Sequence, residues 1–335
     1  MRLRTWLGVT LLLATGLGLY RMATGSGSAI RIWDMPTAYP SSSYQTQTAE
    51  LFAQSVNRCA EGELRVVVHP GGSLFKGHEI KRAVQTGQVP IGERLLSVHS
   101  NDNQFFAVDS IPFVAGSFAD ADRLWRLAEP EMNKLLDREG LQLLYSVIWP
   151  PQGIYFMQPI QSIAEIGGMK FRAYNATTAR VAELAGMIPV QIEAAEMSQA
   201  LATGVVRSFM ASGASGYDSK VWEHVDYYYD VRAWLPRNYV FVNKDEYAAL
   251  SAQARQCMQS AAVMAEQAGT ERAIELTSWY LNQLREHGMT VAPPGEQFGE
   301  ELKQIGSVLA REWAAQVSPE QQAVLDTYHQ SGAVE

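Results

Sequence analysis

The fold is decided by residues 166–216, IGGMKFRAYNATTARVAELAGMIPVQIEAAEMSQALATGVVRSFMASGASG. Apolar residues recur here with the period of a strand in some segments and with that of a helix in others. The pattern predicts three strands and two helices, in alternation: 169–174, 176–185, 188–192, 195–203 and 205–211. Asn175 is placed as an N-cap, and Gly186 and Gly204 end the two helices. Strands that alternate with helices through short loops predict an α/β fold with a parallel sheet.

Arg172 is the candidate binding residue of this stretch. It lies near the carboxyl end of the first strand, one short loop before a helix N-terminus. Ligands bind beyond the carboxyl ends of such strands, and a helix N-terminus offers free N–H groups to an anion. Because arginine stays charged and its planar fork matches a carboxylate, Arg172 is a candidate carboxylate clamp. On the sequence alone, an ion pair at the protein surface is the plainer interpretation.

The same stretch resembles the TRAP-transporter solute-binding proteins, the DctP-type periplasmic receptors. Their pattern is G-(L/M)-K-(hydrophobic)-R, a helix that ends near glycine, a P-V strand and E-x-x-x-A-L-x-x-G-V-V. Residues 168–206 contain every element in this order, and Arg207 departs from the Asp that usually follows. The resemblance extends from about residue 30 to about residue 315. It implies a two-lobed periplasmic binding protein with mostly parallel sheets and a long helix that spans both lobes.

The function that this resemblance implies is an extracytoplasmic solute receptor. Such a receptor binds a small organic carboxylate in the cleft between its lobes and closes over it. It then delivers the ligand to a TRAP permease, which has a large and a small membrane subunit and is driven by an ion gradient. A periplasmic enzyme that holds a carboxylate substrate is the alternative, and an ABC-type receptor is a second one that the long helix disfavours.

Two proline-containing or aromatic segments mark where the chain passes between lobes. Pro150 and Pro151 cannot continue a strand or helix and predict the first crossing. The aromatic run 227–229 precedes the second crossing, and the amphipathic pattern 251–287, interrupted at Gly269, predicts the long helix. We expect a final helix at 298–317. The expected division is a signal peptide at 1–29, lobe I at 30–150 and 238–278, and lobe II at 151–237 and 279–335.

Residues 1–29 have the features of a secretory signal. Arg2 and Arg4 precede an apolar run of about fifteen residues, which is followed by small residues. A spanning helix needs about twenty residues, but the absence of a clean A-x-A site leaves an uncleaved anchor as an alternative. No cysteine follows the run, which disfavours a lipid anchor. We therefore expect export to the periplasm.

The charge of the chain disfavours nucleic acid as a partner. The 335 residues carry a net charge of −8, and removal of the three arginines in 1–29 makes it −11. Nucleic-acid binders are basic. An acidic receptor for anions needs a local positive site rather than a positive surface.

Six further residues are candidates for the ligand site. The resemblance implies that Glu93 and Glu196 face the ligand, whereas solvated acids are the alternative. The others are a donor in the crossing loop, two aromatic walls and a residue at the end of the third strand: Gln152, Trp149, Tyr39 and Ser212. Packing in the core or in loops is the alternative for these four.

The ligand class follows from the cations that the sequence offers. The family often has a second arginine in the crossing segment, but residues 149–166 contain neither Arg nor Lys. With one cation and apolar loops around it, we expect an apolar or aromatic monocarboxylate, such as a 2-oxo acid. A sugar acid needs many polar partners for its hydroxyls and remains the alternative.

The sequence contains no recognisable catalytic or metal motif. The six histidines never pair at ligand spacing, and residues 213–217 fail G-x-S-x-G at the last position. A G-x-x-x-x-G-K-[ST] loop is also absent from the sequence. We expect no enzyme activity, no metal and no cofactor.

Cys59 and Cys257 are the only cysteines. In an exported chain they could form a disulfide or remain as two buried thiols. In the two-lobed arrangement both lie in lobe I, where a disulfide would tie the returning segment to the end of the first helix.

Overall fold

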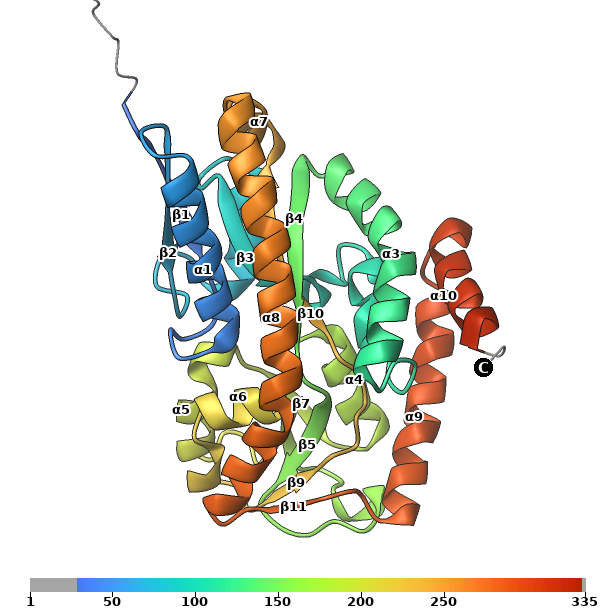
Figure 1. Ribbon diagram of the computed structural model, residues 1–335. Coiled ribbons are helices and arrows are strands. Elements are labelled where there is room, and N and C mark those ends of the chain that lie inside the picture. Colours follow the sequence, from blue (N-terminus) through green and yellow to red (C-terminus); the bar gives the residue numbers. More distant parts are fainter. Residues whose placement is uncertain (1–28, 333–335) are drawn as a thin grey trace, which may run out of the picture.

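The computed structural model describes residues 29–332 and has two lobes joined by crossing strands and a long helix (Figure 1). The predicted signal segment therefore lies outside the described residues, apart from Ala29. Short 3-10 segments lie between the main elements: η1 (Gly77–Glu79), η2 (Leu96–His99), η3 (Gln104–Ser110), η4 (Ile163–Glu165), η5 (Ala194–Glu196) and η6 (Val221–Glu223). The α/β fold that the sequence predicts is confirmed.

The first lobe contains two small sheets. One pairs β1 with β2 in parallel, and the other has the order β3-β10-β4. The strands are β1 (Arg31–Pro36), β2 (Leu64–His69), β3 (Ile91–Leu95), β4 (Leu141–Ile148) and β10 (Arg237–Asn243). The helices around them are α1 (Tyr44–Cys59), α2 (Ile80–Gln85), α3 (Phe118–Arg138) and α7 (Lys244–Ala248). Their apolar faces form one continuous core in which Phe52, Phe241 and Leu136 are fully buried.

The second lobe is built on one sheet with the order β11-β9-β5-β8-β6-β7. Its strands are β5 (Gln152–Phe156), β6 (Lys170–Ala173), β7 (Ile188–Gln191), β8 (Ser208–Ser212), β9 (Tyr227–Tyr229) and β11 (Thr290–Ala292). Its helices are α4 (Ala176–Leu184), α5 (Met197–Ala202), α6 (Gly213–Asp218) and α9 (Glu296–Ala314). The strand–helix order predicted for 166–216 is thus confirmed, with a later start for its third strand.

The crossing strands are antiparallel to their neighbours, both in the β3-β10-β4 sheet and in the sheet of the second lobe. β10 is antiparallel to β3 and β4, and β5 is antiparallel to β8 and β9, while the remaining pairs are parallel. The two crossings lie side by side, because Trp149 N donates to Pro236 O at 2.7 Å and Gln152 N to Trp234 O at 2.9 Å. The prolines at 150 and 151 separate β4 from β5, as the sequence predicts.

The long helix α8 (Ala252–Glu286) has 35 residues and runs along both lobes (Figure 1). It contacts α1 and β4 of the first lobe and α6 and β11 of the second. The predicted interruption at Gly269 is wrong, because the helix continues through it. A Cβ at this position would lie 2.7 Å from Val147 Cγ1 and 3.0 Å from Thr48 Cγ2. The glycine therefore serves the close approach of α8 to β4 and α1.

The C-terminal helix α10 (Pro319–Gly332) was not predicted, and it packs on α3 (Figure 1). The hydroxyl of Tyr328 donates to Val114 O at 2.9 Å, and Arg123 lies over the Tyr328 ring. We expected residues 279–335 in the second lobe, but α10 belongs to the core of the first. Leu325 and Tyr328 are buried there, which is the physical reason for this difference.

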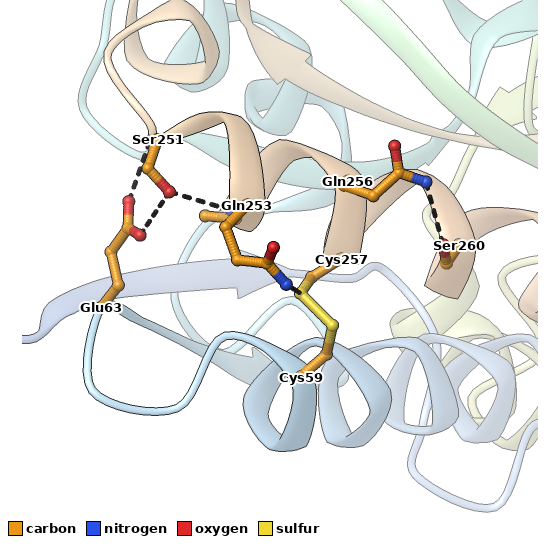
Figure 2. The surroundings of a disulfide bond; sticks show 8 residues. Cys59, Glu63, Ser251, Gln253, Gln256, Cys257 and Ser260 are labelled. Atoms are coloured by element: carbon orange, nitrogen blue, oxygen red, sulfur yellow. Dashed lines mark hydrogen bonds between the residues drawn. A yellow bond between two sulfur atoms is a disulfide. The ribbon is translucent and has the colours of Figure 1, made fainter.

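A disulfide joins Cys59, at the end of α1, to Cys257 in α8 (Figure 2). The two Cα atoms are 5.6 Å apart, and 198 positions separate the residues in sequence. Beside it, Glu63 accepts hydrogen bonds from the backbone N–H and the hydroxyl of Ser251, which is the N-cap of α8. These contacts fasten the returning segment to the first lobe.

Within residues 29–332, none of the helices is sufficiently long and apolar to cross a membrane.

Candidate functional site

A cavity of about 60 Å³ lies between the lobes at the carboxyl ends of β6 and β8. The first lobe and the crossing segments contribute Tyr39, Pro40, Arg94, Leu95, Val98, Trp149 and Pro236. The second lobe contributes Gln152, Arg172, Tyr174, Glu193, Ala194, Met197, Ala211, Ser215, Asp218 and Ser219. A volume of this order holds a small molecule or a few waters, since one water needs about 10–15 Å³.

Arg172 lines the cavity and is only 5% exposed. Its Nε donates to Ile192 O at 2.9 Å, and its guanidinium carbon lies 5.1 Å from the centre of the Tyr174 ring. Among the described residues, no carboxylate forms an ion pair with it. Burial lowers the pKa of Arg172, which reflects the cost of keeping a cation away from water. A carboxylate brought by a ligand would offset that cost.

A second arginine also reaches the cavity, so the expectation of a single cation is wrong. Arg94 comes from β3 of the first lobe, and its Nη2 lies 3.1 and 3.3 Å from the two carboxylate oxygens of Glu193. Glu193 precedes η5 in the second lobe, so this ion pair bridges the lobes. Successive strand residues face opposite sides. The expectation that Glu93 lies on the ligand side of β3 therefore left its neighbour Arg94 on the opposite side.

Glu93 does not line the cavity but lies behind its wall. Asn238 donates from Nδ2 to Glu93 and accepts at Oδ1 from Trp149 Nε1, 2.8 Å away, and from Tyr39 OH at 3.4 Å. The rings of Tyr39 and Trp149 are 4.9 Å apart. Burial raises the pKa of Glu93 to about 7. Glu93 thus holds the amide that orients both aromatic walls.

Gln152 lines the cavity with part of its hydrogen bonding already used. Its Nε2 donates to Pro150 O at 3.1 Å, and its Oε1 lies 3.5 Å from the hydroxyl of Tyr174. Trp234 Nε1 in turn donates to that hydroxyl at 3.2 Å. The sequence prediction missed Tyr174, although it stands two positions after Arg172. The two-residue period of a strand could have placed both on one face.

Ser212 and Glu196 lie outside the cavity lining. The hydroxyl of Ser212 is buried and accepts from Ser215 N at 3.2 Å, which caps α6. Glu196 is exposed on η5. Instead, Ser215 and Asp218 of α6 line the cavity. Burial raises the pKa of Asp218 to about 6.

The part of the chain that the structure describes contains no group of three His, Cys, Asp or Glu residues placed to hold a metal ion.

Comparison with known proteins places this arrangement in a family. The model of the DctP family, "Bacterial extracellular solute-binding protein, family 7", matches residues 35–316. A TRAP solute-binding protein from an unidentified marine microbe, solved with co-purified pyroglutamate, is 47% identical, with a TM-score of 0.88. The match covers 90% of this chain and 99% of that one. DctP6 of Bordetella pertussis, a receptor that binds pyroglutamic acid, is 38% identical, with a TM-score of 0.87 and coverage of 90% and 100%.

A more distant structure shares the fold. A TRAP solute-binding protein of a Sulfitobacter species, solved with bound β-D-galacturonate, is 17% identical, with a TM-score of 0.82. The match covers 90% of this chain and 100% of that one. The two-lobed architecture is therefore common to receptors whose sequences have diverged widely.

Proposed function

Since the chain belongs to bacterial extracellular solute-binding protein family 7, the DctP-type TRAP receptors, we propose that it is a receptor for pyroglutamate or a similar compact monocarboxylate. Binding of a small organic carboxylate is common to this family and its solved members. The observation that carries the proposal is the buried guanidinium of Arg172, which has no carboxylate partner among residues 29–332. Two relatives above 30% identity that were solved with or bind pyroglutamate support the ligand class.

In this proposal each part of the cavity has a separate role. The fork of Arg172 binds the ligand carboxylate in a bidentate, charge-assisted pair. Tyr39 and Trp149 cover the apolar part of the ring, and Gln152 offers its remaining N–H to a ligand oxygen. The small cavity and its aromatic wall favour a compact ring over an extended sugar acid. The proposal keeps the expected monocarboxylate but puts a compact polar ring in place of the apolar or aromatic body, such as that of a 2-oxo acid, that the sequence predicts.

The ligand is tested by thermal shift and calorimetry on protein that has been unfolded, dialysed and refolded to remove bound solute. L-Pyroglutamate, succinate, galacturonate, benzoate and 2-oxoisocaproate form the panel. At a hundred times its dissociation constant, a ligand adds roughly 2.7 kcal/mol to the free energy of unfolding and raises the melting temperature by several degrees. We expect this shift with pyroglutamate. A shift with galacturonate but not with pyroglutamate would contradict the proposal.

Delivery of the ligand to a TRAP permease is the second part of the proposal. It is supported by family membership, because TRAP solute receptors pass their ligand to a membrane permease instead of altering it. We expect this permease to be driven by an ion gradient. Export through residues 1–29 would bring the receptor to the periplasm. Fractionation of cells followed by N-terminal sequencing tests export and cleavage together. NMR of the ligand after long incubation with the protein separates a receptor from a periplasmic enzyme, because a receptor leaves the ligand chemically unchanged.

A further inference from the structure

One of the two cations that line the cavity is already neutralised. Arg94 is held by both carboxylate oxygens of Glu193, whereas among the described residues Arg172 has a backbone carbonyl as its hydrogen-bond partner and lies over the Tyr174 ring. Asp218 also lines the cavity, and it lines two neighbouring surface grooves as well. A ligand in the cavity therefore meets one unpaired positive charge, one neutralised ion pair and the carboxyl group of Asp218.

The Arg94–Glu193 pair has little room to rearrange. The side chain of Arg94 is 3% exposed, and its Nε is buried without a partner among residues 29–332. A Cβ at Gly77 would lie 2.5 Å from Arg94 Nη1 and 2.7 Å from Glu193 Oε2. The backbone of η1 thus packs directly on the pair.

We propose that Glu193 is a specificity-determining residue, which restricts the cavity to ligands with a single negative charge. This inference rests on the proposed function and adds the reason for its selectivity. By occupying Arg94, Glu193 leaves Arg172 as the clamp for one carboxylate. A second carboxylate on the ligand would find no free cation among the described residues that line the cavity, because Glu193 already neutralises Arg94, and the carboxylate of Asp218 would repel it. Glu193 therefore lowers the affinity of the cavity for competing dicarboxylates.

The test compares glutarate and glutaramate, which differ in charge but hardly in shape, and uses a cyclic monocarboxylate as the reference. Glutarate carries two carboxylates, glutaramate has an amide in place of one of them, and L-pyroglutamate serves as the reference. Calorimetry at pH 7.5 gives the ratio of the dissociation constant of glutarate to that of pyroglutamate. Glu193→Gln keeps the shape of the side chain and removes its charge. We expect this ratio to fall by about tenfold or more, while the affinity for glutaramate changes less.

Two further variants isolate the charge of Glu193. Glu183→Gln removes the same charge from an exposed ion pair with Arg180 in the same lobe, and it should leave the ratio unchanged. Arg94→Met combined with Glu193→Gln removes both members of the pair. Because Arg172 is again the unpaired cation, this double variant should regain the preference for monocarboxylates. Melting curves verify that each variant is folded.

The proposal fails if folded Glu193→Gln shows no detectable glutarate binding or a ratio within twofold of the wild type. It also fails if the double variant keeps the relaxed ratio of Glu193→Gln. A wild-type protein that binds pyroglutamate with an unchanged ratio in Glu193→Gln contradicts this inference alone. Absence of pyroglutamate and glutaramate binding by the wild type contradicts the proposed function and, with it, this inference.

Discussion

At the scale of the residue, Arg172 combines burial with the lack of a described acidic partner. We expect Arg172→Ala to lose about 2–5 kcal/mol of binding free energy, because the ligand carboxylate is left unpaired in a closed cavity. Arg172→Lys should also bind weakly, since an ammonium does not reproduce the fork. The free energy of unfolding without ligand should not fall by as much, because the substitution removes a buried unpaired charge. Calorimetry and urea unfolding measure the two effects.

Arg180→Ala is the matched control for Arg172→Ala. Arg180 forms an exposed ion pair with Glu312 outside the ligand cavity. Its removal should leave ligand affinity unchanged. Near-wild-type affinity in Arg172→Ala would exclude Arg172 as the clamp.

The raised pKa of Glu93 gives a second prediction at the residue scale, a pH dependence of the free energy of unfolding. Its pKa is raised to about 7 in the folded protein, against 4.5 as the ordinary value. The folded state therefore binds more protons between these pH values, so this residue makes stability fall as pH rises from about 4.5 to about 7. The contribution is roughly 3 kcal/mol at most. Glu93→Gln should flatten the curve of unfolding free energy against pH and increase stability at pH 8.

Asp109 and Asp218, with pKa values raised to about 6 by burial, act in the same direction and remain in the Glu93→Gln variant. The difference between wild type and variant therefore isolates Glu93. Parallel pH curves for the two proteins would show that Glu93 does not titrate in this range.

At the scale of the element, Gly269 decides how closely α8 lies to the first lobe. We expect Gly269→Ala to destabilise the protein by roughly 1–3 kcal/mol, since the new Cβ would overlap Val147 and Thr48. This outweighs the gain of about 1 kcal/mol that alanine brings to a helix interior. Gly299→Ala in α9 is the control, because its Cβ would meet only Pro294, at 3.4 Å from Cγ and 3.9 Å from Cβ, and should not destabilise. Equal melting temperatures for both variants would contradict the expected overlap.

The disulfide between α1 and α8 gives a second prediction for the elements. Closing a loop of 198 residues stabilises by roughly 5 kcal/mol in the chain-entropy model, and measured values are often lower. The Cys59→Ser, Cys257→Ser double variant should lose stability in urea but keep its ligand affinity, because neither cysteine lines the cavity. Thiol titration of the unfolded, unreduced protein should find no free thiol. Two free thiols would contradict the bond.

At the scale of the whole molecule, the contacts between lobes predict closure on binding. Arg94 and Glu193 bridge the lobes, and Asn175 Nδ2 donates to Ser97 Oγ at 3.0 Å. A ligand on Arg172 adds to these contacts and shifts the population towards the closed state. Small-angle scattering should show a smaller radius of gyration with pyroglutamate than without it. Arg172→Ala should show no such change. Identical scattering curves of the wild type with and without pyroglutamate would argue against closure.

The sequence by itself determined the order of elements in 166–216 and the position of Arg172. These features depend on local periodicity, capping residues and glycine stops, which act within a few positions. The prolines at 150 and 151 likewise marked the first crossing. The tertiary structure decided what depends on distant contacts. Arg94 meets Glu193 across the lobes, Glu93 faces Asn238 behind the cavity wall, and α10 packs on α3. None of these partners is near in sequence, so no local pattern could pair them.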